Sequence, residues 1–152
     1  MNVFNRTITV SVQTKDDQHV VVDGIFIDSH HELFLNMTVD IESFKVIAAY
    51  GELRRAPHED CLITGKLTLN LEGIDLTRNV RKQIAAAVGG ERGCTHFEEL
   101  ALECVKGFKQ ARFRLMRLTM PLEEVNTQLN DYLKGSCYHY RRKKVDDGQA
   151  AR

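Results

Sequence analysis

The first third of the chain alternates apolar and polar residues with the period of a β-strand. When every second residue of a strand is apolar, one face of the strand can be buried and the other can be exposed to solvent. Short polar breaks that suit hairpins separate the alternating segments. Three or four antiparallel strands that bury one face are therefore predicted. The segments are TITVSV (7–12), HVVVDGIFID (19–28), ELFLNMTVDI (32–41) and FKVIAAYGEL (44–53).

The second half changes to apolar spacings of three and four residues, which are typical of helices packed on one side. A first helix is predicted over 76–88, where Gly89-Gly90 supplies the stop, a second from Phe97 to Leu115, and a third from Leu122 to Leu133 after Pro121. Residues 62–72 fit either a strand or a helix, and we favour a helix. The predicted fold class is α+β, an N-terminal antiparallel sheet of three to four strands packed by about three C-terminal helices.

Length and composition limit what the chain can do without identifying a partner. With 152 residues it can bury a core that needs no metal or disulfide for folding, so a bound metal would serve function. We expect one α+β domain over 1–140 and a flexible tail over 141–152, where apolar residues become scarce. The formal net charge is zero, so nucleic acid is not a favoured partner, whereas a protein partner or a homo-oligomer stays open.

No segment approaches the ~18 to 20 consecutive apolar residues of a membrane span, and the N-terminus lacks the pattern of a signal peptide. We therefore expect a cytoplasmic protein with no membrane partner. Its four cysteines are too sparse for a secreted disulfide scaffold, which leaves redox, metal or packing roles. Cys104 lies on the apolar stripe of the second helix and is interpreted as a small core residue.

The segment GGERGCTHFEEL (89–100) holds the strongest chemical candidate. Thr95 and Glu98 have the spacing of a capping box, which places Cys94 just outside a helix and His96 in its first turn. Free backbone N–H groups and the helix dipole favour a thiolate there. Cys94 is thus the best nucleophile or ligand in the chain. The alternative is a small-residue turn with a half-buried thiol and a solvated His96.

Other candidates lie far from this segment in the sequence. Cys61 follows a proline-containing connection, three residues after His58, and a second Cys-x-His begins at Cys137. Strand alternation puts His31 on the apolar face at the start of its strand, where it is either a satisfied polar residue or a ligand. The cysteine spacings match no standard zinc finger, so any metal site must be assembled by the fold.

The segments APHEDC and LEGIDLTRNVRKQIAAAVGGERGCTHFEEL resemble the bacterial domain-of-unknown-function 2889 family. The resemblance rests on a proline shortly before a cysteine, a leucine-x-glycine, a long helix and a Gly-Cys-Thr-His signature. Phe97 replaces the leucine that follows this signature in the family. The similarity covers about 31–109, and GSCYHY resembles a cysteine-histidine segment near the family's end. The family has no established activity.

The order of elements is also similar to that of iron–sulfur scaffold proteins of the NifU and IscU type. This layout implies that Cys61 and Cys94 converge at the end of the sheet. The ligands it implies for zinc, iron or an iron–sulfur cluster are Cys61, Cys94, His31, Glu32, His96 and Cys137. Two thiolates with one or two imidazoles suit zinc.

Three hypotheses follow for function. The first is an uncharacterised bacterial protein that binds zinc, iron or an iron–sulfur cluster at a Cys/His site between the sheet end and a helix start. The second is a cysteine-dependent enzyme with Cys94 as catalytic nucleophile and His96 or His58 as base. The third is a non-catalytic accessory or small-ligand-binding protein whose cysteines are incidental.

Overall fold

The computed structural model describes residues 1–141 and divides the chain into two compact units, Met1–Arg112 and Phe113–Arg152. The division falls inside the long helix α2 (Thr95–Thr119). The expectation of one domain over 1–140 stays a prediction. Beyond Arg141, the tail predicted for 141–152 lies outside the described residues.

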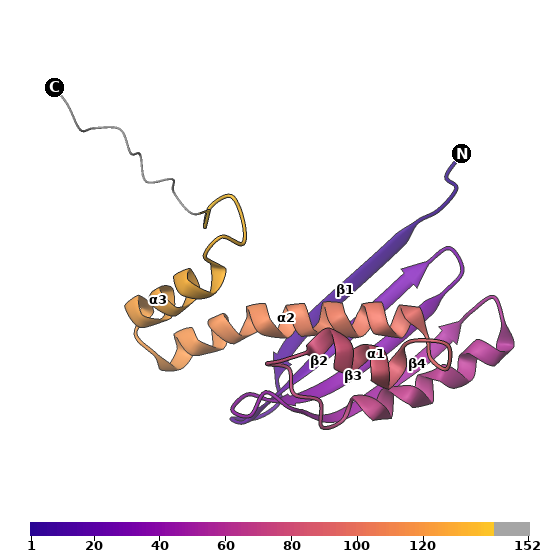
Figure 1. The fold of residues 1–152 in the computed structure, drawn as a ribbon, viewed down its shortest axis with the longest axis horizontal. Helices are drawn as coiled ribbons and strands as arrows, with labels where there is room; N and C mark the ends of the chain where they lie inside the picture. Colours follow the sequence, from indigo (N-terminus) through magenta and orange to yellow (C-terminus); the bar gives the residue numbers. More distant parts are fainter. Residues whose placement is uncertain (142–152) are drawn as a thin grey trace. The chain divides into compact units, whose positions relative to one another are not determined.

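The first unit begins with a four-stranded antiparallel sheet in which each strand pairs with the next along the chain (Figure 1). This order follows from short connections, which favour hairpins between sequential strands. The predicted sheet and its antiparallel pairing are confirmed. The strands are β1 (Arg6–Thr14), β2 (His19–Asp28), β3 (Glu32–Asp40) and β4 (Val46–Arg55).

The strand register brings the apolar residues of neighbouring strands onto one face. Val22 pairs with Val12 on one side and with Met37 on the other. Val22 and Met37 are buried, whereas Ile25 on the other face of β2 is 40% exposed. Because side chains alternate along each strand, this register defines one buried face that extends across the sheet.

The segment after β4 forms a 3₁₀-helix, η1 (Glu59–Leu71), which packs against β4. The preference for helix over strand in 62–72 is therefore confirmed. The contact is close because Gly65 has no side chain: a β-carbon on it would lie 2.8 Å from the carbonyl oxygen of Gly51. Buried Thr68 donates its hydroxyl to the Gly65 carbonyl, which satisfies the polar group.

Helix α1 (Val80–Val88) is shorter than predicted. Leu76 is buried as expected, yet its amide donates to the Phe44 carbonyl at 2.9 Å instead of entering the helix. The Asp75 carboxylate accepts the Thr77 amide at 2.8 Å, and Asn79 takes a left-handed conformation at the helix cap. These local bonds hold the segment in a turn. The predicted start at 76 is therefore wrong, whereas the end before Gly89 is confirmed.

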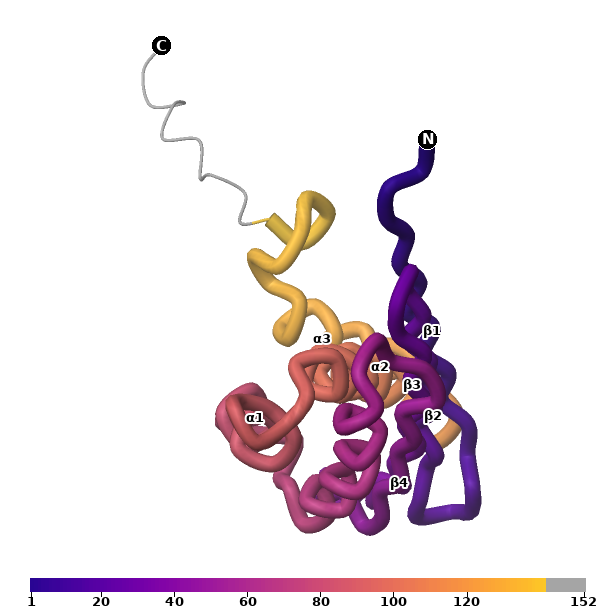
Figure 2. Tube along the Cα trace, turned by 90° about the vertical axis from the view of Figure 1, so that its right-hand side faces the viewer, coloured from indigo at the N-terminus to yellow at the C-terminus, as the bar shows by residue number. Residues whose placement is uncertain are grey.

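Helix α2 lies across the buried face of the sheet, and α1 lies on the same side (Figure 2). The helix approaches β2 closely at Gly24, where a β-carbon would lie 2.9 Å from Leu100 Cδ1. The α+β fold class is thus confirmed. The largest fully buried side chains between these layers are Phe26, Leu33, Leu35, Met37, Phe97, Leu100 and Phe108.

The second unit contains the end of α2 and helix α3 (Leu122–Leu133). Pro121 occupies the cap of α3, and the rings of Phe113 and Tyr132 lie 5.2 Å apart. Gly135 takes a positive φ of 78° and its amide donates to the Tyr140 carbonyl at 2.6 Å. The third helix that the sequence predicts is confirmed.

Candidate functional site

The turn between β2 and β3 is organised around Asp28, the last residue of β2. Its carboxylate oxygen Oδ1 accepts the backbone amides of His30 and His31 at 2.8 and 2.7 Å. Aspartate commonly forms such turns because its short side chain reaches amides two and three residues ahead. The same oxygen lies 3.1 Å from His31 Nδ1, so the turn also fixes the His31 imidazole.

The second part of the site is the loop that precedes α2. Gly90 has a positive φ of 71°, and the Cys94 amide donates to the Val88 carbonyl at 2.6 Å. Gly93 must remain small, because a β-carbon there would collide with the carbonyl oxygens of Val88 and Gly89. The loop therefore folds back on the end of α1 and delivers Cys94 to the start of α2.

Helix α2 begins at Thr95, so Cys94 occupies the cap position and its carbonyl accepts the Glu98 amide at 3.0 Å. The capping box predicted for Thr95 and Glu98 is not formed, because Thr95 is the first residue of the helix and Cys94 is the cap. The Glu98 carboxylate instead lies against Gly89 in the preceding loop. The predicted placement of Cys94 just outside the helix and of His96 in its first turn is correct.

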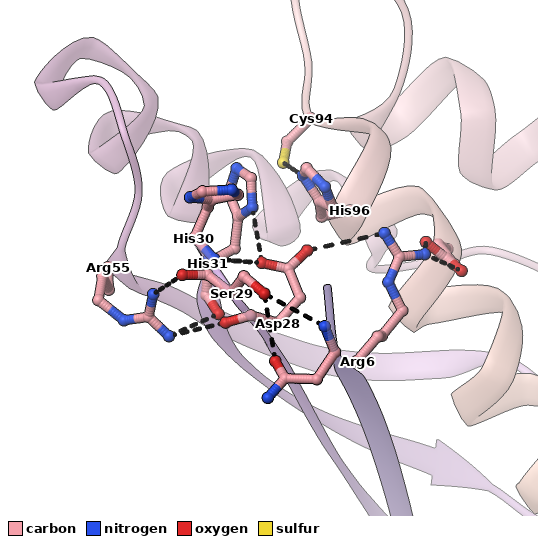
Figure 3. Close-up of polar contacts among 10 residues, drawn as sticks. Arg6, Asp28, Ser29, His30, His31, Arg55, Cys94 and His96 are labelled. Atoms are coloured by element: carbon pink, nitrogen blue, oxygen red, sulfur yellow. Dashed lines mark hydrogen bonds and ion pairs between the residues drawn. The ribbon is translucent and has the colours of Figure 1, made fainter. Parts of the chain in front are cut away.

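The two parts meet at the end of the sheet, where Asp28, His31 and His96 form a cluster (Figure 3). One potential ligand atom from each of the three lies within 4.8 Å of the others. Within residues 1–141, no other three histidine, cysteine, aspartate or glutamate side chains converge in this way. Cys94 Sγ lies 3.9 Å from His96 Nδ1, at the edge of the cluster.

The cluster is partly sheltered from solvent. Asp28 is buried, and His31, His96 and Cys94 are half-buried. The imidazole rings of His31 and His96 have centroids 3.9 Å apart, and Phe26 lies edge-on to His96 at 5.1 Å. The site therefore combines an apolar wall with a compact set of nitrogen, oxygen and sulfur donors.

Two arginines support the turn from outside. The Arg6 guanidinium lies 3.6 Å from Asp28 Oδ2 and forms an ion pair with the Glu99 carboxylate at 2.9 Å. The same guanidinium stacks over the Phe26 ring. Arg55 donates to the backbone carbonyls of Asp28, Ser29 and His31 at 3.0 to 3.2 Å. Because these donors are occupied within the protein, the arginines hold the turn in place.

Electrostatics favour an ionised Asp28 beside a neutral His96. Burial alone would raise the pKa of Asp28, but hydrogen bonds from the backbone amides of His30 and His31 and from the His31 ring lower it to about 2. Burial lowers the pKa of His96, and the neighbouring His31 lowers it further. A neutral imidazole retains the nitrogen lone pair that a metal or a transferred proton requires.

The structure brings together some of the predicted residues and separates others. His31 and His96 share the cluster, and Cys94 adjoins it. Cys61 is half-buried on η1. Burial raises the pKa of its thiol, and the neighbouring Asp60 carboxylate raises it further. Cys61 does not belong to the cluster of three, and its predicted convergence with Cys94 stays a prediction.

Glu32 and Cys137 lie elsewhere. The Glu32 carboxylate is 4.0 Å from the Arg54 guanidinium, and strand alternation places it on the opposite face from buried Leu33. Cys137 is exposed and belongs to the second unit. Cys104 is fully buried, as its place on the apolar stripe predicts, and burial raises the pKa of its thiol to about 12.

Sequence reasoning missed Asp28. A signal for it existed, because an aspartate three residues before His31 and at the end of an alternating segment is typical of an Asx turn. Its role depends on the position of His96, which comes from a distant helix. The turn could have been predicted from the sequence, but the cluster could not.

The fold and the cluster define an α+β protein with a histidine, aspartate and cysteine site between a β-turn and a helix start. A family model matches residues 4–110, and the chain belongs to the family described as protein of unknown function (DUF2889). The family resemblance proposed from the sequence is thereby confirmed. Comparison with curated proteins and with solved structures finds no match. No helix within residues 1–141 is both long enough and apolar enough to cross a bilayer.

Proposed function

We propose that this protein binds a divalent transition-metal ion at the cluster of Asp28, His31 and His96, with a thiol ligand from the adjacent Cys94. The observation that carries the proposal is the convergence of one donor atom from each of the three clustered residues within 4.8 Å. The Cys94 thiol, 3.9 Å from the His96 ring, adds a soft donor at the edge of the same cluster.

The donor set favours zinc, with iron as the alternative. Imidazole and thiolate bind zinc at about 2.0 to 2.3 Å, so ligand atoms that share one ion lie roughly 3 to 4 Å apart. The donor atoms of the cluster, which lie within 4.8 Å of one another, would have to move closer together to share an ion. Zinc does not require redox chemistry or a larger sulfur ligand set.

An iron–sulfur cluster fits this donor set less well. Such clusters are held mainly by cysteine thiolates, whereas only Cys94 adjoins the histidine cluster directly. Cys61, on the neighbouring 3₁₀-helix, is the available second thiol. A mononuclear ion bound by histidines and one thiolate needs neither Cys61 nor Cys137, and it is the form of metal binding that we propose.

The test is metal analysis of untagged protein after reconstitution with zinc or iron(II). We expect one equivalent of metal in the wild-type protein, and loss of binding in His31→Ala and His96→Ala. His30→Ala is the matched control, because His30 is exposed, adjacent in sequence and outside the cluster. The proposal fails if wild-type protein retains no stoichiometric metal, or if His31→Ala binds it as well as His30→Ala.

A second candidate function is thiol catalysis, favoured by the 3.9 Å separation of Cys94 Sγ and His96 Nδ1. His96 would accept the thiol proton, and the thiolate would attack an electrophilic carbon. Alkylation of metal-free protein by iodoacetamide tests this pairing, because sulfur bonds to carbon as iodide leaves. His96→Ala should slow labelling of Cys94 near neutral pH. Equal labelling rates in wild-type and variant proteins would argue against it.

A further inference from the structure

We propose that Asp28 is a positioning residue of the metal site and not a ligand: it holds the His31 imidazole with its proton on Nδ1 and leaves Nε2 to bind the metal. This inference rests on the metal-binding function proposed above. It divides the cluster into ligands and a supporting carboxylate.

Both oxygens of Asp28 already have partners within the protein. Oδ1 receives the amides of His30 and His31 at 2.8 and 2.7 Å and lies 3.1 Å from His31 Nδ1. Oδ2 faces the Arg6 guanidinium at 3.6 Å. A metal bound directly to Asp28 would have to compete with these donors, and the positive charge of Arg6 would oppose it.

The hydrogen bond between Asp28 and His31 assigns the proton. An ionised carboxylate only accepts hydrogen bonds, so the neutral His31 ring must donate from Nδ1. Its other nitrogen, Nε2, then has a free lone pair. A carboxylate that binds the far nitrogen of a metal-ligating histidine is a recurring arrangement that orients the ring and raises its basicity.

The surrounding contacts keep this geometry in place. The Arg55 guanidinium donates hydrogen bonds to the backbone carbonyls of Asp28, Ser29 and His31, which stabilises the turn. The His31 ring packs beside the His96 ring. Figure 3 shows Asp28 between His31 and Arg6, with His96 and Cys94 above them. His31 and His96 thus remain as ligands from the cluster, and Cys94, whose thiol lies at the edge of the cluster 3.9 Å from His96 Nδ1, is the third proposed ligand. A tetrahedral ion held by these three residues would keep one position for water or a substrate.

Nitrogen NMR of histidine-labelled, metal-free wild-type protein tests the assignment directly. At pH ~8.5, two units above the ordinary histidine pKa of ~6.5, the two neutral tautomers give distinct two-bond correlations. The His31 signals are identified by their loss in His31→Ala. We expect the tautomer protonated on Nδ1. A His31 ring protonated mainly on Nε2 overturns the inference, whether or not metal binds.

Two substitutions separate the turn from the imidazole contact. Asp28→Asn retains at Oδ1 an oxygen that can accept from the turn amides and the His31 ring, while its amide nitrogen replaces the Oδ2 that faces Arg6. The tautomer should therefore persist, and zinc affinity should fall less than in Asp28→Ser. Asp28→Ser can accept the turn amides through its hydroxyl but is too short to reach Nδ1. We expect Asp28→Ser to lose the tautomer preference and to bind zinc about 10- to 100-fold more weakly.

Zinc titration of these variants distinguishes this inference from the proposed function. If wild-type protein binds zinc and Asp28→Asn keeps the His31 tautomer yet loses as much affinity as Asp28→Ser, orientation of the ring by the hydrogen bond does not account for the affinity and the positioning role is wrong. An unchanged His31 tautomer in Asp28→Ser also overturns it. If wild-type protein binds no zinc, the metal-binding function fails, and the wild-type tautomer measurement still decides how Asp28 acts on His31.

Discussion

The imidazole rings of His31 and His96 lie with their centroids 3.9 Å apart and their planes tilted by 34°. His31 directly precedes β3, and His96 lies in the first turn of α2. Their approach depends on α2 crossing the sheet with its N-terminus at the β2–β3 turn. This relationship supplies the two imidazoles on which the proposed metal site depends.

Zinc should stabilise the native protein, because an ion that binds only the folded state lowers its free energy. At a free zinc concentration one hundred times Kd, the expected gain is about 2.7 kcal/mol, enough to raise Tm by roughly 5 to 10 °C. Thermal unfolding followed by circular dichroism should show this shift in wild-type protein and in His30→Ala. A similar shift in His96→Ala would place the stabilising ion elsewhere.

The stability of metal-free protein should depend on Asp28 in acid. Because folding lowers the pKa of Asp28 from 3.8 to about 2, its ionised form stabilises the native state at neutral pH. This contribution, on the order of 2 kcal/mol, is present above the unfolded-state pKa and is lost as pH falls through about 2. Urea unfolding across this range should show the stability advantage over Asp28→Asn shrinking between pH ~5 and ~2. A difference that does not change with pH would contradict the prediction.

Three of the four thiols, those of Cys61, Cys104 and Cys137, should differ in their reactivity toward iodoacetamide. Cys137 is exposed, and a hydrogen bond from the Tyr140 backbone amide lowers its pKa, so it should label early. Burial raises the pKa of Cys61, which should label more slowly, and Cys104 should stay unmodified in native protein. Peptide mass spectrometry over a time course measures this order. Labelling in denaturant is the control, because Cys104 should then be alkylated as fast as the other cysteines. Early labelling of Cys104 in native protein would contradict the prediction, because it would show that the core opens.

Gly24 should tolerate no larger residue, because α2 packs directly on it. A β-carbon at this position would collide with Cys104 Sγ and lie 2.9 Å from Leu100 Cδ1. Gly24→Ala should therefore lower the free energy of unfolding by about 1 to 3 kcal/mol. Ser11→Ala, at an exposed position of β1, serves as the control and should change it by less than ~0.5 kcal/mol. If the two variants have equal free energies of unfolding in urea, α2 does not pack directly on Gly24.

The amino-acid sequence by itself determined the elements whose signals are local. Alternation of apolar residues identified the four strands, because a strand with one buried face needs only a period of two. Helical spacing and Gly89-Gly90 likewise placed the end of α1. Helix α1 starts later than its apolar spacing predicts, because the Asp75 turn and the hydrogen bond from the Leu76 amide to the Phe44 carbonyl hold the preceding residues outside the helix.

Only the tertiary structure decided which chemical groups meet. The sequence singled out His31, His96 and Cys94 but could not show that Asp28 lies among them, or that Cys94 adjoins His96 and His31 at the end of the sheet. Those outcomes depend on strand register and on where α2 crosses the sheet, both of which are set by long-range packing of residues such as Gly24 and Leu100. Local periodicity contains no information on that crossing, whereas a site built from two distant segments depends on it.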